Sequence, residues 1–479
     1  MSSTVANGEK PPITNKVRWL YGFGSVAYGV KDNGFSYFLL FYYNQVLGLP
    51  GAYAGTAILI AMIFDAISDP LVGVWSDNTH SRWGRRHPFM YASAIPVAFV
   101  YFVLWNPPEL SEFWLFIYLT VASIMIRFFI TLYEIPSTSI VAELTDDYDE
   151  RTRLLSLRYM MGWYGGLLMA LLMWGVLMVA YGQGNETTFR LYGSIGALAM
   201  LIAIVGSSWG LHGYIPYLKA PPQRESYAVG QLLSDIKVTL SNRNFAALFF
   251  AGLFAAIGGG VSTNFNTYIN LHFWEFTPEQ VRYIIVVLFG SAVLAAVLAP
   301  KITARFDKKR SAIGIYLTAI IFGAAPVMLR LIGWFPGNDS PYLYPIMLVH
   351  AMMDVTLIIM FGIVQSSMLA DIVEYSEINT GRREEGLFFA ARTFAAKATS
   401  SVGAFLAGIA LQIIAFPTDA EPGTVDPDII WNLGFIYGPT LMVFYFMALA
   451  SISFYRITRS GHNDRVATLN ASTGKVSEG

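Results

Sequence analysis

Residues 52–77 read AYAGTAILIAMIFDAISDPLVGVWSD, an almost unbroken apolar stretch that carries two acidic side chains, Asp65 and Asp69. A transmembrane α-helix needs roughly 20 consecutive, mostly apolar residues, so this stretch is long enough to cross a bilayer. Similar stretches recur along the chain. Of its 479 residues, 55% are hydrophobic and 13% are charged, whereas soluble domains are about 25% charged. The pattern predicts an all-α membrane protein with lipid as its solvent.

We expect about twelve transmembrane helices, six in each half of the chain, with no sizeable soluble domain between them. The first six are predicted at residues 17–48, 52–77, 88–107, 113–143, 154–181 and 189–217. The second six are predicted at residues 243–273, 279–303, 311–334, 341–373, 385–416 and 429–457.

Lysine and arginine gather in alternate connections between these helices, and the opposite connections lack them. By the positive-inside rule the basic connections are cytoplasmic, which places both termini in the cytoplasm. The layout predicts a multi-pass protein of a plasma membrane, the inner membrane of a bacterium. Its predicted parts are an N-terminal six-helix bundle (1–218), a cytoplasmic linker (219–242), a C-terminal six-helix bundle (243–460) and a cytoplasmic tail (461–479).

The composition and the missing motifs exclude several classes of function. The chain has no cysteine, which excludes disulfides and thiol catalysis, and its formal net charge of −1 offers no basic surface for nucleic acid. No HExxH pair is present, so an intramembrane metalloenzyme is not expected. A channel is disfavoured because the charges inside the helices are scattered and paired instead of forming a ring.

The connection after the second predicted helix carries a further motif. Gly73 and Asp77 precede the basic sequence RWGRR at residues 82–86. This loop resembles the signature of the major facilitator superfamily, although four inserted residues separate the Asp from the basic cluster here. A positive-inside loop that happens to contain glycine is the alternative. The resemblance implies a fold of two six-helix bundles.

Ionisable residues inside the predicted helices mark candidate functional positions, because a charge at the bilayer centre costs at least about 2.5–3.5 kcal/mol unless it is paired or hydrated. Asp65 and Asp69 are four residues apart and share one helix face, while Pro70 loosens the turn that carries Asp69. Two such carboxylates repel each other unless a cation or a proton lies between them, which predicts a coupling-ion site. In the alternative, Asp69 only caps a broken helix and Asp65 pairs with an arginine. The first half also holds Lys31, Asp32, Glu134 and Arg158.

The second half adds basic residues. Lys397 lies in the stretch AARTFAAKATSSVGAF, whose small residues permit close helix approach. Its position is too central for the ammonium group to reach the interface easily, so we expect it to face a cavity. A gate of ion pairs is predicted at the cytoplasmic end, with a solvated loop as the alternative. Its residues are Asp371, Arg382 and Arg383.

Over nearly its whole length the chain resembles the glycoside-pentoside-hexuronide:cation symporter family. The resemblance rests on Lys31-Asp32, FDAISDP (64–70), TLYEIP (131–136), Arg158, MLADIVEYSE (368–377) and Lys397. It implies symport of a solute with Na+ or H+, without any other metal or cofactor. The implied cation ligands are Asp65, Ser68, Asp69, Thr131 and Glu134. The implied substrate-binding residues are Lys31, Asp32, Glu134, Arg158, Arg392, Thr393 and Lys397.

Departures from the family pattern affect which class of solute we expect. Thr138 and Gly362 stand where a family member has tryptophans that cradle the sugar, and Arg392 replaces a neutral amide. The added guanidinium suits a carboxylate, sulfonate or phosphate. We therefore expect a glycoside or hexuronide-type sugar, with an anionic amphiphile such as a lysophospholipid as the alternative. Ser68 and Glu134 leave the choice between Na+ and H+ open.

The expected mechanism is alternating access. The cation organises Asp65, Asp69 and Glu134, and these orient the solute-binding side chains of the first and fifth predicted helices. The expected partners are a small-molecule solute, the coupling cation and the lipid bilayer, with the protein acting as a monomer.

Overall fold

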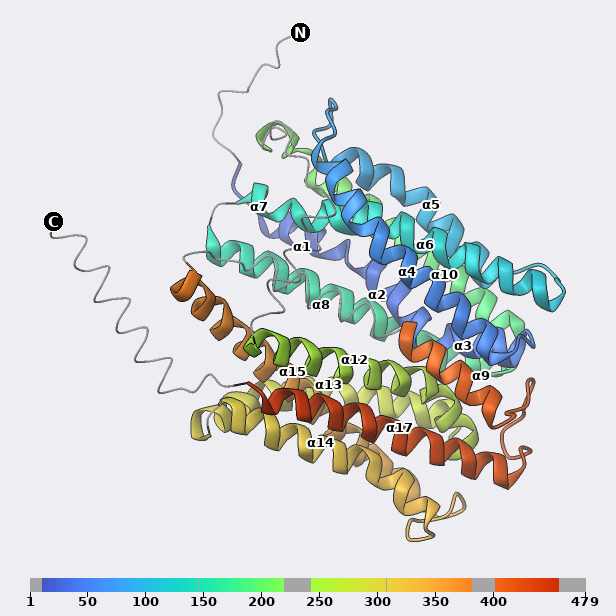
Figure 1. The fold of residues 1–479 in the computed structure, drawn as a ribbon. Coiled ribbons are helices and arrows are strands. Elements are labelled where there is room, and N and C mark those ends of the chain that lie inside the picture. The colour runs from blue at the N-terminus through green and yellow to red at the C-terminus, as the bar shows by residue number, and fades with distance from the viewer. Residues whose placement is uncertain (1–10, 146, 219–242, 307, 381–400, 456–479) are drawn as a thin grey trace. The chain divides into compact units, whose positions relative to one another are not determined.

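The computed structural model describes residues 11–145, 147–218, 243–306, 308–380 and 401–455 (Figure 1). All regular elements within these ranges are helices. Ten of the helices are long and apolar enough to cross a membrane. The long helices are α4 (Gly51–Asp77), α5 (His87–Trp105), α6 (Glu112–Ser139), α8 (Tyr148–Leu172), α10 (Glu186–His212), α12 (Arg243–Tyr268), α13 (Pro278–Arg305), α14 (Lys308–Leu331), α15 (Leu343–Thr380) and α17 (Pro427–Ser453).

The first predicted helix, 17–48, is divided into shorter pieces. Its pieces are α1 (Asn15–Phe23), α2 (Val26–Asn33), α3 (Leu39–Phe41) and two π-helical turns, Gly34–Phe38 and Tyr42–Val46. Inserted π-helical turns are frequent at functional sites. A Cβ atom at Gly29 would lie only 1.8 Å from the carbonyl oxygen of Gly162 in α8. Glycine therefore lets α2 approach α8 closely, next to the turn that carries Lys31.

Short segments follow three of the long helices. They are α7 (Val141–Leu144) after α6, a π-helical turn (Met173–Leu177) and α9 (Met178–Tyr181) after α8, and a 3-10 turn (Ile215–Tyr217) after α10. A further π-helical turn, Ile269–Phe273, ends α12. The helix predicted at 113–143 is therefore broken after Ser139, and α7 continues it as a separate turn.

Helix starts agree with the sequence to within three residues, except that α8 begins at Tyr148, six residues before its predicted start. Local capping accounts for the differences at α10 and α13. α10 begins at Glu186, three residues before the predicted start, because the Asn185 side chain accepts a hydrogen bond from the Thr187 backbone amide. α13 begins at Pro278, where Thr277 and Gln280 form a reciprocal capping box.

The chain divides into two compact units by its internal contacts. Unit 1 comprises Met1–Tyr227 and Ala404–Thr424, and unit 2 comprises Ala228–Gly403 and Val425–Gly479. The predicted linker, 219–242, and tail, 461–479, lie outside the described residues. The twelve-helix prediction also included a helix at 385–416, of which the structure describes only the apolar helix Ser401–Ile413.

Part of that helix belongs to unit 1 and meets the start of α4. A Cβ atom at Gly408 would lie 2.1 Å from the carbonyl oxygen of Gly51. One turn further along α4, a Cβ atom at Gly55 would lie 2.7 Å from the carbonyl oxygen of Ala404. Small residues thus allow backbone to lie against backbone at this end of α4. We call this the glycine contact.

In unit 2, α12 and α14 pack against α17, and α13 packs against α15. Tyr316 of α14 stacks on Phe361 of α15 with ring centroids 4.0 Å apart, inside an apolar core.

Candidate ion and solute site

The helices α4 and α6 pack against each other in unit 1, and each contains a proline beside an acidic residue. Pro70 follows Asp69 directly, and Pro136 follows Glu134 by two residues. Proline cannot donate the backbone hydrogen bond that its position in a helix requires. Both helices are therefore loosened where they carry these carboxylates.

Asp65 lies buried between two side chains of α6. Thr131 donates a hydrogen bond from its hydroxyl to Oδ1 of Asp65 at 3.1 Å. Arg127 donates from Nη1 to Oδ2 at 3.3 Å. The side chains of Arg127 and Asp65 are 3% and 5% exposed. Asp65 is thus the counter-ion of a buried arginine. This agrees with the alternative interpretation of the sequence, in which Asp65 pairs with an arginine.

Thr131 also contacts the second carboxylate of α4. Its Oγ1 lies 2.9 Å from Oδ1 of Asp69, so one hydroxyl group lies within hydrogen-bonding distance of both carboxylates. The spacing expected from the sequence therefore brings Asp65 and Asp69 to a common point on α6. A positive charge or a proton at this point would relieve the repulsion between them.

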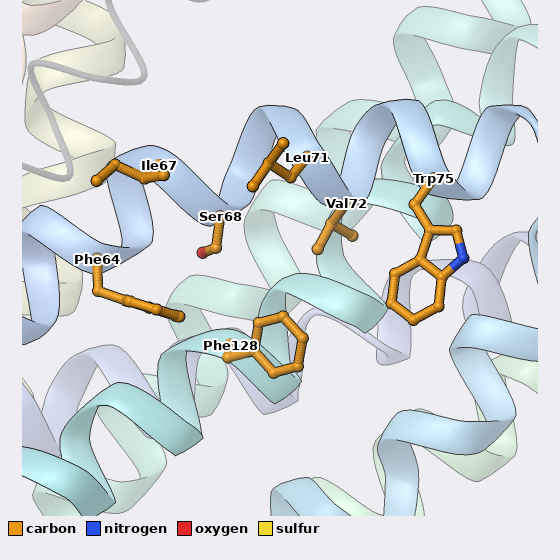
Figure 2. Close-up of a pocket in the computed structure, with 7 residues that line it drawn as sticks. All are labelled: Phe64, Ile67, Ser68, Leu71, Val72, Trp75 and Phe128. Carbon is orange, nitrogen blue, oxygen red and sulfur yellow. The ribbon is translucent and has the colours of Figure 1, made fainter.

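Ser68 lies between the two aspartates in sequence, yet its hydroxyl donates to the backbone carbonyl of Asp65 at 3.2 Å. The same side chain borders a groove of about 320 Å³ whose other lining residues are apolar. Figure 2 shows Ser68 among these residues, which are Phe64, Ile67, Leu71, Val72, Trp75 and Phe128. The described hydrogen bond of Ser68 thus goes to backbone and not to a carboxylate.

Glu134 forms the second ion pair of the site. Its Oε2 accepts a hydrogen bond from Nη2 of Arg158 in α8 at 2.8 Å, and the same nitrogen donates to Ser137 at 2.9 Å. The Arg158 guanidinium also lies 5.5 Å from the ring centroid of Tyr21 and 6.0 Å from that of Tyr133. Its Nη1 has no hydrogen-bond partner among the described residues. That nitrogen retains donor capacity for a ligand.

Lys31 and Asp32 end α2 and differ in exposure. The Lys31 ammonium lies 3.8 Å from a carboxylate oxygen of Asp32 and 4.3 Å from the ring centroid of Tyr28. The Lys31 side chain is 7% exposed, whereas that of Asp32 is 49% exposed. The amine is therefore held in place by its neighbours while the carboxylate remains accessible.

Other predicted site residues fall outside the part of the chain whose side chains the structure describes. They are the predicted substrate contacts Arg392, Thr393 and Lys397, and the predicted gate residues Asp371, Arg382 and Arg383. Their roles stay predictions.

Sequence reasoning missed Arg127. It lies inside α6 at four residues before Thr131 and seven before Glu134, a spacing that puts all three on one helix face. The signal was present, because a charged residue inside an apolar helix is the criterion that singled out Glu134.

Four charges at the opposite end of α4 from the glycine contact also form a compact group, which we call the loop cluster. Arg85 and Arg86 both pair with Glu143 of α7, and both lie near Asp77, at 3.5 and 3.3 Å. Burial lowers the pKa of the Arg86 guanidinium, and the Glu143 carboxylate offsets part of this effect. The basic residues of the motif at 82–86 thus tie together the ends of α4, α5 and α7.

Comparison with known proteins identifies the family. Residues 20–459 match the family of MFS/sugar transport proteins. The chain belongs to this family. The match confirms the resemblance to glycoside-pentoside-hexuronide:cation symporters and shows that the protein is a membrane transporter and not an enzyme.

Relatives of this transporter match over most of their length. An uncharacterized symporter of Synechocystis is 27% identical, with 96% of each chain covered. The putative glycoside/cation symporter YagG of Escherichia coli is 25% identical, with 93% of each chain covered. The isoprimeverose transporter of Lactiplantibacillus pentosus is 25% identical, covering 82% of this chain and 79% of the other.

Solved structures confirm the fold. The inward-open xylose transporter XylE of E. coli superposes with a TM-score of 0.59 at 16% identity, over 94% of this chain and 99% of the other. The nucleoside transporter NupG superposes with a TM-score of 0.60 at 15% identity, over 93% and 100%. The predicted all-α membrane protein with the major facilitator fold is thus confirmed.

Proposed function

We propose that this transporter couples the uptake of a glycoside or hexuronide-type sugar to the flow of Na+ or H+ by alternating access. One observation carries the proposal. The Thr131 hydroxyl contacts the carboxylates of both Asp65 and Asp69, and one turn later the same helix carries Glu134, which holds Arg158. The family description and the name of YagG support a sugar as the solute and a cation as its partner.

The ion acts first on the pair of helices α4 and α6. A positive charge bound beside Asp69 draws its carboxylate and Thr131 together, because it removes the repulsion from Asp65. Any shift of Thr131 moves Glu134, which lies three residues further along α6. The two binding events share a structural element and are therefore coupled without direct contact between ion and solute.

The solute binds to the polar groups that α2 and α8 present. Arg158 offers Nη1, and Lys31 and Asp32 supply a donor and an acceptor. Sugar hydroxyls can accept from the two cations and donate to the carboxylate of Asp32. A hexuronide carboxylate would gain a charge-assisted hydrogen bond from Arg158, which favours an acidic sugar over its neutral counterpart.

Uptake by the purified protein in proteoliposomes tests the proposal. A panel of neutral glycosides and their hexuronide counterparts is supplied with a sodium gradient, a pH gradient or no gradient. We expect gradient-driven accumulation of at least one sugar, lost in Thr131→Val and retained in Thr131→Ser. The two variants differ in the hydroxyl that joins the carboxylates. Accumulation by Thr131→Val equal to that of the parent would remove the ion-site assignment.

A further inference from the structure

We propose that Asn266 of α12 and Asn270 of the π-helical turn that ends α12 form a subsite for two hydroxyl groups of the transported sugar. This inference rests on the proposed function and specifies which part of the solute unit 2 recognises. The chain carries no charged residue between Arg243 and His272, so the subsite lies on an uncharged helix. It differs in this respect from the ion pairs of unit 1.

Asn266 and Asn270 lie one turn apart, and a hydrogen bond joins their side chains. Nδ2 of Asn270 donates to the backbone carbonyl of Asn266 at 2.9 Å and to Oδ1 of Asn266 at 3.0 Å. A backbone carbonyl can only accept, so the first contact fixes which end of the Asn270 amide is the nitrogen. The orientation of the Asn266 amide follows, because its oxygen has to face that nitrogen.

The pair therefore offers one free donor group and one free acceptor to a ligand. The described residues provide no hydrogen-bond partner for Nδ2 of Asn266 or for Oδ1 of Asn270, and both side chains are half-buried. A metal cation would meet the amide hydrogens of Asn266, and an anion would meet the oxygen of Asn270. Hydroxyl groups fit both, because one can accept from Asn266 while a second donates to Asn270.

The face of the helix that carries the pair has room beside it and is not an apolar surface. Gly259 lies two turns before Asn266 on the same face, and a Cβ atom added there would meet no atom within 4 Å. Among the described residues of α12, Phe250 is the exposed large apolar side chain, whereas α13 exposes several, among them Val286 and Val293. Lipid offers no hydrogen-bond partner to an amide. The unused amide groups are therefore suited to water or a polar solute.

A hydroxyl group on the same face of α12 shows what a contact between helices looks like. The Ser262 hydroxyl lies 3.2 Å from the phenolic oxygen of Tyr437 in α17. The hydrogen bonds of Asn266 and Asn270, in contrast, stay within α12 and its terminal turn. Ser262 thus joins two helices, whereas the amide pair joins none of the described ones. This difference supplies the matched control.

Four versions of the full-length protein test the inference: the parent, Asn266→Ala, Asn270→Ala and Ser262→Ala. The probes are the methyl glycosides of glucose, galactose, xylose and glucuronic acid, each with its monodeoxy derivatives. Affinity is measured in detergent, without any ion gradient, from the rise in unfolding temperature over a concentration series.

We expect the parent to bind at least one of these sugars, and to bind a particular monodeoxy derivative of it about three- to tenfold more weakly, because one neutral hydrogen bond is missing. Each asparagine variant should bind the complete sugar more weakly by a similar factor. It should also bind one such derivative as tightly as the complete sugar, since the partner of the missing hydroxyl is already gone. Ser262→Ala should keep the affinities of the parent and lower only the unfolding temperature.

Equal affinities in the parent and both asparagine variants overturn the inference, as does a parent that binds none of the four sugars. A variant that binds every sugar more weakly but still discriminates as the parent does also overturns it, because that pattern indicates a structural role. If one asparagine variant does not fold, the other still removes one end of the pair. Failure of both to fold would show that the amides hold the helix and not the sugar.

Uptake in proteoliposomes separates this result from the proposed function. Sugar binding that depends on the asparagines, without cation-driven accumulation, would remove the proposed symport and keep the subsite. Cation-driven accumulation that neither asparagine substitution changes would keep the symport and remove the subsite.

Discussion

Asp65 and Asp69 lie one turn apart on α4, yet their surroundings differ. Asp65 is closed in by Arg127 and Thr131, whereas Asp69 is only partly buried and contacts Thr131. Neutral substitutions should therefore have opposite consequences at the two positions. The coupling-ion interpretation of the sequence treated them as an equivalent pair.

We expect Asp69→Asn to lose gradient-driven accumulation while keeping its thermal stability, because it removes a carboxylate of the ion site and a neutral side chain costs less in lipid than a charged one. Asp65→Asn should instead lose stability, since breaking a buried ion pair costs about 3–5 kcal/mol. Accumulation in proteoliposomes measures the first effect, and thermal unfolding in detergent measures the second. The double variant Asp65→Asn/Arg127→Gln should recover much of the lost stability. Full accumulation by Asp69→Asn would contradict the assignment.

Glu134→Gln should weaken solute binding by about tenfold or more, because Arg158 loses a charge-assisted hydrogen bond and its position. The measurement is the apparent affinity in solute exchange without any ion gradient. Ser137→Ala provides the control, since it removes the weaker neutral contact to the same nitrogen. An unchanged affinity in Glu134→Gln would mean that the ion pair is only structural.

At the scale of elements, α4 and α6 combine an apolar surface with a loosened turn beside the site. Pro70 and Pro136 lie within two residues of Asp69 and Glu134. A helix that lacks a backbone hydrogen bond at such a point bends and adjusts more readily than an intact one. The prolines thus give both helices local freedom where the ion binds.

Pro70→Ala should raise thermal stability and slow gradient-driven uptake, because it restores a backbone donor and stiffens the turn next to Asp69. Pro96→Ala is the matched control, since Pro96 lies inside α5, which carries none of the predicted site residues. Its substitution should stabilise the protein without a comparable effect on uptake. Equal slowing by both substitutions would show that proline acts through general flexibility.

The sequence predicts those structural features that leave a local pattern of hydrophobic or charged residues. Long apolar runs predicted the ten long helices because length and hydropathy alone decide membrane insertion. The π-helical turns in the first helix and the close contact of Gly29 with α8 were not predicted, since no local sequence pattern records either of them. The sequence predicted the site carboxylates because a charge inside an apolar helix is energetically costly in lipid. It did not predict the pairing of Asp65 with Arg127, because that pair forms only when α4 packs on α6.

At the scale of the whole molecule, unit 1 is held at its loop end by charges and at the start of α4 by backbone contact. In the loop cluster, Glu143 is the shared partner of Arg85 and Arg86 and its side chain is 3% exposed. Asp77, which pairs with the same arginines, is 48% exposed. The buried carboxylate should therefore dominate the stability of this end.

We expect Glu143→Gln to lower the unfolding temperature clearly, because it leaves two arginines without their buried carboxylate. Asp77→Asn should have a much smaller effect, since exposed ion pairs contribute only about 0–1 kcal/mol. Thermal unfolding of the two variants in the same detergent measures the difference. A larger loss in Asp77→Asn would show that the exposed pair holds the cluster.

The glycine contact gives the two ends of α4 different responses to electrolyte. Gly51 and Gly408 meet without side chains or charges, so added salt has nothing to screen there. At the other end, the exposed part of the loop cluster is open to screening, because the Debye length falls from about 10 Å at 0.1 M salt to about 3 Å at 1 M. Concentrated salt should speed amide hydrogen exchange near Asp77 and leave exchange near Gly51 unchanged. High ionic strength would then loosen unit 1 selectively at the loop-cluster end of α4, without any mutation.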